Sequence, residues 1–193
     1  MSFSPDSNGA IYKPDGPAYS RVDMAFEEDE LFQSLLFGRR KELEDGRCYL
    51  VKERKPDRGL ALFLGLVDRG YRPLVITRQH PNHLTKAHAG VDLRAIWLST
   101  TLGNDYIDPH NLNALTNVIL AHVAGGGKSA ILLDGLEYLM INNEATRVFK
   151  FLEYLNEVVA QTAAILLLSV DERAFEPRDL ALLERDATVL EKP

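Results

Sequence analysis

ILLDGLEYL (131–139) indicates the fold more directly than any other stretch of the chain. It opens with three apolar residues in a row, which is typical of a strand covered on both faces of a parallel sheet. The predicted strand ends on a carboxylate, Asp134, and Gly135 follows, so a turn is expected there. Ligands of open parallel sheets bind beyond the carboxyl ends of the strands. Asp134 is therefore the first candidate for a functional residue.

Similar short apolar segments alternate with amphipathic segments along the rest of the chain. Their patterns predict strands at 48–51, 73–77, 95–99, 130–134, 164–169 and 188–191, and helices at 57–68, 109–124, 145–160 and 177–185. The expected N-caps are Asp108 for the second of these helices and Asn142 or Asn143 for the third. This alternation predicts an α/β fold with three layers and a mostly parallel sheet.

The beginning of the chain differs from the rest. Residues 1–20 mix Pro, Gly, Ser, Asn and Asp without an apolar period, which predicts a flexible N-terminal arm. An amphipathic helix is expected over 23–44, because five apolar residues share one face: Leu31, Phe32, Leu35, Leu36 and Leu43. We therefore expect a single α/β domain over 21–193 with an N-terminal helical extension.

The composition of the chain disfavours nucleic-acid-binding and membrane proteins. The net charge of −6 disfavours a broad nucleic-acid surface, which needs clustered cations. The longest apolar run, 163–168, is too short to cross a bilayer, and the first residues lack the apolar core of a signal peptide. The single cysteine, Cys48, is expected to be a buried, inert thiol. These features predict a cytoplasmic protein with no membrane or nucleic-acid partner.

GGGKS (125–129) superficially resembles part of a phosphate-binding loop. A phosphate loop, GxxxxGK[ST], leaves a strand and enters a helix, whereas this segment leaves a predicted helix and enters a strand. His122 also stands where the first glycine of the motif is required. We interpret the glycines as a helix C-cap and turn.

Charged residues collect just after the predicted strands. The candidate ligand or ion-pair cluster is Lys52, Glu53, Arg54, Lys55, Arg78, His80, Asp134 and Glu137. The loop 52–58 stands where a phosphate loop would stand, but Glu53 would repel a phosphate there. Its cations could instead hold an anion through their side chains near a helix N-terminus. Two simpler alternatives are a solvated loop and an Arg78 paired with Glu53 or Asp134.

No cofactor or metal site is predicted. His80, His83 and His88 do not share a helical face at i,i+4 spacing. Asp134 would hold a metal only if magnesium binds there, as hard cations accept oxygen ligands. A role for Asp134 as a turn cap or an ion-pair partner is the alternative.

The segments GRCYLVKERKP, LVITRQHP, IWLST, ILLDGLEYLMINN, ILLLSVD and LLERD, in this order, resemble the archaeal domain-of-unknown-function family number eight-three-five. The resemblance covers roughly 46–185. It implies a role in signalling, because members of that family often follow PAS-type sensor domains or membrane segments in archaeal signalling proteins.

More distantly, the layout is similar to RecA-like ATPases of the KaiC group, which implies a RecA/KaiC-like fold. In that group a catalytic glutamate pair follows the strand that matches 73–77, where this chain has Arg78, Gln79 and His80. Asp134 would correspond to the magnesium aspartate of the group. Because the phosphate loop and the glutamates are both absent, hydrolysis is not expected, and the protein is not expected to be an enzyme.

These observations leave several functional hypotheses open. The leading one is a non-catalytic protein-interaction module in archaeal signalling or regulation, with protein partners and a homo-oligomeric state. The alternative is a regulatory domain that binds a nucleotide or another anion with Lys52, Arg54, Lys55 and Arg78. A metal-dependent hydrolase with Asp134, Glu137 and Asp171 as ligands is a third hypothesis.

Overall fold

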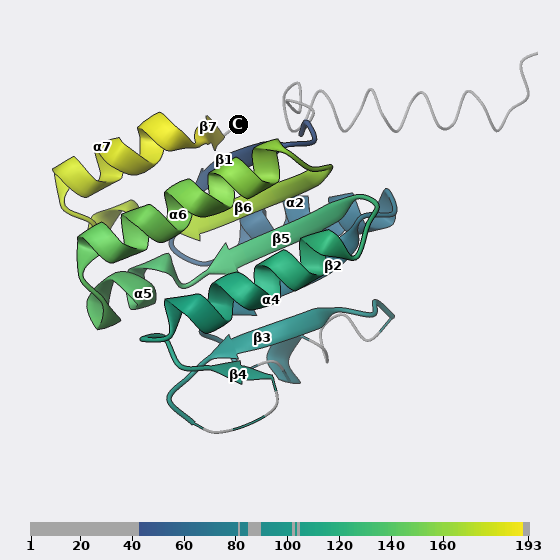
Figure 1. The fold of residues 1–193 in the computed structure, drawn as a ribbon, viewed down its shortest axis with the longest axis horizontal. Helices are drawn as coiled ribbons and strands as arrows, with labels where there is room; N and C mark the ends of the chain where they lie inside the picture. Colours follow the sequence, from purple (N-terminus) through teal and green to yellow (C-terminus); the bar gives the residue numbers. More distant parts are fainter. Residues whose placement is uncertain (1–42, 81, 85–89, 102, 104, 191–193) are drawn as a thin grey trace, which may run out of the picture. The chain divides into compact units, whose positions relative to one another are not determined.

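Seven parallel strands form the centre of the fold, in the order β4-β3-β2-β5-β6-β1-β7 (Figure 1). The computed structural model describes residues 43–80, 82–84, 90–101, 103 and 105–190. They lie within one compact unit, Glu42–Lys192. The strands are β1 (Arg47–Lys52), β2 (Arg72–Thr77), β3 (Arg94–Leu98), β4 (Tyr106–Ile107), β5 (Ser129–Asp134), β6 (Ala164–Val170) and β7 (Thr188–Leu190).

Helices cover both faces of this sheet. The helix α2 (Asp57–Asp68) packs on one face, and the other face carries α4 (Leu112–Ala124), α5 (Leu136–Asn142), α6 (Ala145–Ala160) and α7 (Pro177–Asp186). A short 3-10 helix, η1 (Glu172–Ala174), follows β6. Figure 1 shows α4 and α6 crossing the near face with α2 behind the sheet. None of the helices in the described ranges is long and apolar enough to cross a bilayer.

Side chains of each central strand alternate between two apolar cores. On β1, Leu50 faces the core under α4, α5 and α6, whereas Tyr49 and Val51 face the core under α2. On β5, Leu133 and Leu132 divide in the same way. Because both faces are covered, the strands need no polar positions, which explains their continuous apolar sequences. The three-layer α/β fold class is confirmed.

The predicted elements match the observed ones closely. The helices expected at 57–68 and 145–160 have those bounds, and every predicted strand is present within one or two residues. Cys48 is buried, as expected, and burial raises the pKa of its thiol to about 12. The expectations for residues 1–42, an arm and an amphipathic helix, lie outside the described residues.

Two predictions for helix starts were wrong. The helix α4 begins at Leu112 rather than at residue 109, and its N-cap is Asn111, whose side chain accepts from the backbone N–H of Ala114 at 3.0 Å. Asp108 instead accepts from the backbone N–H of His110. The residue before α6 is Glu144, with no capping bond from its side chain. The prediction also missed β4 and α5, and α5 stands where only a turn was expected.

The GGGKS segment is a helix end, as the sequence predicts. Gly125 is the C-cap residue of α4, and its N–H donates to the carbonyl of His122 at 3.3 Å. Gly126 and Gly127 follow with φ of 78° and 73°, a left-handed conformation that favours glycine. The turn then leads directly into β5.

Candidate functional site

A cleft of about 550 Å³ lies where β1, β2, β5 and β6 end, which we call the carboxyl edge of the sheet. Six of the predicted candidate residues line it: Glu53, Arg54, Lys55, Arg78, Asp134 and Glu137. They come from separate segments of the chain and meet because parallel strands end at the same edge. The site is thus assembled by the sheet topology.

Glu53 closes the N-terminus of α2. Its carboxylate accepts from the backbone N–H of Arg58 at 2.7 Å and of Gly59 at 2.9 Å. The buried hydroxyl of Ser169, at the end of β6, donates to it at 2.7 Å. The first N–H groups of a helix have no partner within the helix and attract anions. Glu53 therefore supplies from within the chain the negative charge that a bound phosphate would supply at such a site.

Gly59 makes this arrangement possible. A Cβ at this position would lie 2.7 Å from Oε1 of Glu53 and 3.3 Å from Cβ of Ser169. Any larger residue would therefore push the carboxylate away from the helix N-terminus. The loop 52–58 and Gly59 together form an internally capped turn, so an external anion cannot use these N–H groups while Glu53 holds them.

Three cations face the cleft. Arg54, Lys55 and Arg78 have exposed side chains, and none of them forms an ion pair with any carboxylate in the described part of the chain. The interpretation of Arg78 as an arginine paired with Glu53 or Asp134 is therefore wrong for this structure. The side chain of Arg78 passes close to Gly135, where a Cβ would lie 2.7 Å from its Cγ. Gly135 also has a φ of 132°, so both its backbone and its surroundings favour glycine.

Two carboxylates form the inner part of the cleft. Asp134 accepts from the buried hydroxyl of Thr77 at 2.7 Å, and Glu137 accepts from the backbone N–H of Asp171 at 2.5 Å. Burial raises the pKa of both groups, and the nearby charge of Arg78 opposes the rise. Asp134 is bonded across to β2 and does not cap the turn that follows it. Neither carboxylate pairs with a cation within 4.0 Å in the described ranges.

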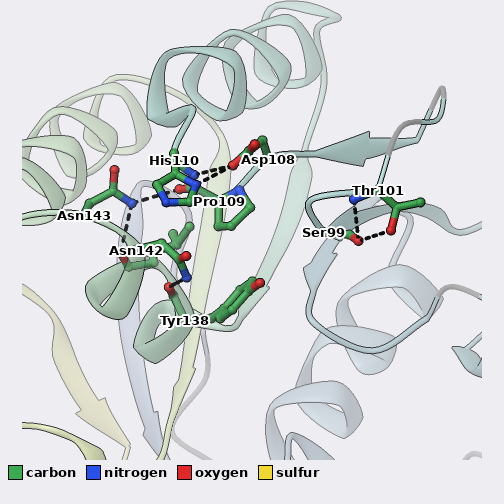
Figure 2. Close-up of polar contacts among 9 residues, drawn as sticks. Ser99, Thr101, Asp108, Pro109, His110, Tyr138, Asn142 and Asn143 are labelled. Carbon is green, nitrogen blue, oxygen red and sulfur yellow. Dashed lines mark hydrogen bonds and ion pairs between the residues drawn. The ribbon is translucent and has the colours of Figure 1, made fainter.

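The helix α5, which carries Glu137, is fixed by the asparagines at its end. Asn142 donates to the carbonyl of Tyr138 at 2.7 Å, and Asn143 donates to those of Leu139 at 2.9 Å and Pro109 at 2.8 Å. Figure 2 shows these bonds joining the end of α5 to the segment before α4. Both asparagines thus bond back to α5 or across to Pro109 instead of capping α6. This anchor holds Glu137 and Ile141 at the cleft.

Two predicted residues do not belong to the cleft. The ammonium group of Lys52 forms ion pairs with Glu184 and, at 3.4 Å, with Glu172. His80 instead packs against Trp97, with ring centroids 4.7 Å apart. Lys52 is the last residue of β1 and His80 is the third residue after β2, so both are near the edge in sequence while their side chains make other contacts.

Asp171 does not present a free carboxylate. It pairs with Arg173 at 2.5 Å, and this hydrogen-bonded guanidinium lowers the pKa of Asp171 to about 2. Sequence reasoning missed three other lining residues, Pro56, Ile141 and Ala174. Ile141 was missed because the seven-residue helix α5 was not predicted. A turn was expected there, and a turn does not indicate which side chains face outward.

Comparison with known proteins assigns this α/β domain to a family. Residues 52–186 match the family model described as "Protein of unknown function (DUF835)". The match covers more than half of the chain, so the chain belongs to this family, as its sequence segments predict. No curated protein matches the chain.

A solved structure shares the fold. It is described as "Structural study of Project ID PH0250 from Pyrococcus horikoshii OT3", and it is similar with a TM-score of 0.55 at 18% identity. The similarity covers 85% of this chain and 87% of that one. At this identity the likeness concerns the fold alone.

Proposed function

We propose that this domain is a non-catalytic regulatory module that binds a small anionic ligand in its carboxyl-edge cleft. One observation carries the proposal: Arg54, Lys55 and Arg78 line a single cleft, and no carboxylate in the described ranges pairs with them. An unpaired guanidinium is a donor suited to carboxylate or phosphate. A cleft of about 550 Å³ lies within the size range of small-molecule sites.

The proposal includes a RecA/KaiC-like ancestry without hydrolysis. Glu53 uses the α2 N–H groups that a phosphate loop would offer to phosphate. Arg78 stands at the position of a catalytic glutamate, and a guanidinium is a hydrogen-bond donor that cannot act as a general base on water. Binding without turnover is therefore the activity that this set of side chains supports, in a cytoplasmic signalling protein.

The test is a thermal-shift panel with the full chain. Inorganic phosphate, citrate, ATP, ADP, GTP and cyclic nucleotides are each titrated with and without magnesium. A ligand that binds the folded state raises the melting temperature by mass action. We expect at least one anion to do so in the wild type and in Lys52→Ala, whose cation lies outside the cleft, and not in Arg78→Ala. The proposal fails if no anion shifts the transition or if Arg78→Ala responds like the wild type.

A second candidate function is protein interaction, with a second copy of the chain or an archaeal signalling protein as partner. Ile141 favours it, because this cleft residue is 79% exposed. A large apolar side chain on a rim is a typical anchor of a protein contact. Light scattering tests it: Ile141→Ser should dissociate an oligomer, and Tyr154→Ser, at another exposed apolar position, should not. A wild-type chain that is monomeric across the concentration range would contradict the self-association.

A further inference from the structure

The carboxyl-edge cleft contains charges of both signs that form no ion pairs with each other. The positive charges are those of Arg54, Lys55 and Arg78, and the negative charges are those of the half-buried carboxylates of Asp134 and Glu137. No ion pair within 4.0 Å joins the two sets among the residues that the structure describes. Other charged groups of the domain do pair, as Lys52 does with Glu184.

Such an arrangement is only partly balanced within the chain. A half-buried carboxylate loses hydration, and among the described cations only the attraction of Arg78, which forms no ion pair within 4.0 Å, offsets this loss for Asp134 and Glu137. A simple anion bound at Arg78 would also be repelled by Asp134 and Glu137, and a simple cation bound at these carboxylates would be repelled by Arg78. A ligand that carries both charges satisfies both sets at once.

We infer that the cleft binds a zwitterion, with its ammonium group at Asp134 and Glu137 and its anionic group at Arg78. This inference rests on the proposed function and names the class of ligand. Oδ2 of Asp134 accepts from Thr77 and Oε1 of Glu137 accepts from the N–H of Asp171, and an ammonium group would add charged donors to these two carboxylates. Three N–H donors of an ammonium group suit two carboxylates.

The positions of the two charge sets favour a compact zwitterion. Arg78 passes beside Gly135, the residue that directly follows Asp134, so the anion and ammonium positions are neighbours. An α-amino acid carries its two charges on adjacent carbon atoms and fits this closeness. Pro56, Ile141 and Ala174 supply an apolar wall for a side chain. An α-amino acid with an apolar side chain therefore matches the cleft in charge and polarity.

The test compares one amino acid with its two singly charged analogues by isothermal titration calorimetry. L-Leucine carries both charges, 4-methylpentanoate lacks the ammonium group, and 3-methylbutylamine lacks the carboxylate. We expect leucine to bind the full chain at least about tenfold more tightly than either analogue, since a charge-assisted hydrogen bond contributes at least that much. Equal affinity for leucine and 4-methylpentanoate would overturn the inference, and so would anion binding that needs magnesium in place of an ammonium group.

Variants separate this inference from the proposed function. Asp134→Asn and Glu137→Gln each keep an acceptor oxygen, and each should lower leucine affinity toward that of 4-methylpentanoate. Arg78→Ala should lower it toward that of 3-methylbutylamine, and Lys52→Ala should leave it unchanged. If 4-methylpentanoate binds as tightly as leucine and its binding is lost in Arg78→Ala, the proposed function stands and the inference of a zwitterionic ligand is wrong. If none of the three probes binds and no anion shifts the melting temperature, both are wrong.

Discussion

The two edges of the sheet use their charges differently. At the edge where the strands begin, which we call the amino edge, Asp45 accepts from the hydroxyl of Tyr71 at 2.5 Å and pairs with Lys128 at 3.0 Å. Arg72 donates there to the carbonyl of His122 at 2.7 Å and to the hydroxyl of Ser129 at 3.0 Å. The three cations that line the carboxyl-edge cleft, Arg54, Lys55 and Arg78, by contrast, have no ion-pair partners in the described ranges.

This difference indicates that the charges of the amino edge stabilise the fold and that the charges of the carboxyl-edge cleft serve binding. Groups that bond one another close the amino edge, and Lys128 of the GGGKS segment takes part in this closure instead of binding phosphate. At the carboxyl edge Glu53 is the internal cap of α2, and Lys52 and Asp171 form ion pairs outside the two sets of cleft charges. The two sets of cleft charges form no ion pairs in the described ranges and can bind a ligand. Substitutions at the amino edge should therefore change stability, and most substitutions at the carboxyl edge should change binding.

The largest effect on stability is expected from Arg72→Ala. This change leaves the His122 carbonyl and the buried Ser129 hydroxyl without their charged donor. Hydrogen bonds to a charged group contribute about 1.5–3 kcal/mol, and one nitrogen, Nη2 of Arg72, makes both bonds, so the free energy of unfolding should fall by about 2–3 kcal/mol. Urea denaturation measures it. The matched control is Arg78→Ala, whose free energy of unfolding should stay within about 0.5 kcal/mol of that of the wild type. Equal losses of stability in the two variants would contradict the difference between the two edges.

Glu53→Ala should have the next largest effect, and it is the exception at the carboxyl edge. It removes the partner of two N–H groups at the start of α2 and of the Ser169 hydroxyl. Loss of a helix cap costs about 1–2 kcal/mol. Denaturant titration should show this loss, with a smaller one in Glu53→Gln, which keeps an acceptor oxygen. An unchanged stability of Glu53→Ala would show that the carboxylate does not hold these groups.

A smaller effect is expected from Lys128→Ala. Its ion pair with Asp45 is largely exposed, and solvent screens exposed pairs, so the loss of stability should be smaller than in Glu53→Ala. Lys55→Ala, the matched change at the carboxyl edge, should leave stability unchanged and weaken anion binding instead. Thermal denaturation with and without ligand distinguishes the two. A loss of binding in Lys128→Ala would contradict the assignment of this lysine to the amino edge.

The smallest effect concerns pH. Burial raises the pKa of Asp134 and Glu137 above their ordinary values of 3.8 and 4.5, so the folded state keeps these protons at a pH where the unfolded chain has lost them. Their contribution to stability is therefore complete below about 3.8 and 4.5 and falls as pH rises through the folded-state pKa values. Asp134→Asn and Glu137→Gln should flatten this fall in urea titrations from pH 3 to pH 8. A slope identical to that of the wild type would contradict it.

The sequence predicts the fold well because its signals are local. The helices at 57–68 and 145–160 follow from apolar periodicity, and the strands follow from continuous apolar runs. The seven-residue helix α5 was missed because it is too short to show a period. Its last residue, Asn142, and its C-cap, Asn143, are as typical of an N-cap as of a helix end.

The candidate site was predictable in position and only partly in detail. Parallel topology indicates that Arg78, Asp134 and Glu137 meet, and they line one cleft. The bond from Ser169 to Glu53 spans 116 residues, so no local pattern indicates it. Lys52 forms an ion pair with Glu184 of α7. This contact follows from the packing of α7 beside β1, which no local pattern around Lys52 indicates.

Trp97 offers the most direct test of the claim that the charges of the cleft bind a ligand. It is the only tryptophan of the chain, and its indole N–H donates to the backbone carbonyl of Arg78 at 2.9 Å. The measurement is the fluorescence of Trp97 during titration with the anion panel and with leucine, in the wild type and in Arg78→Ala. The account predicts a saturable change in the wild type that is lost in Arg78→Ala. No change with any ligand, or the same change in both proteins, would contradict it.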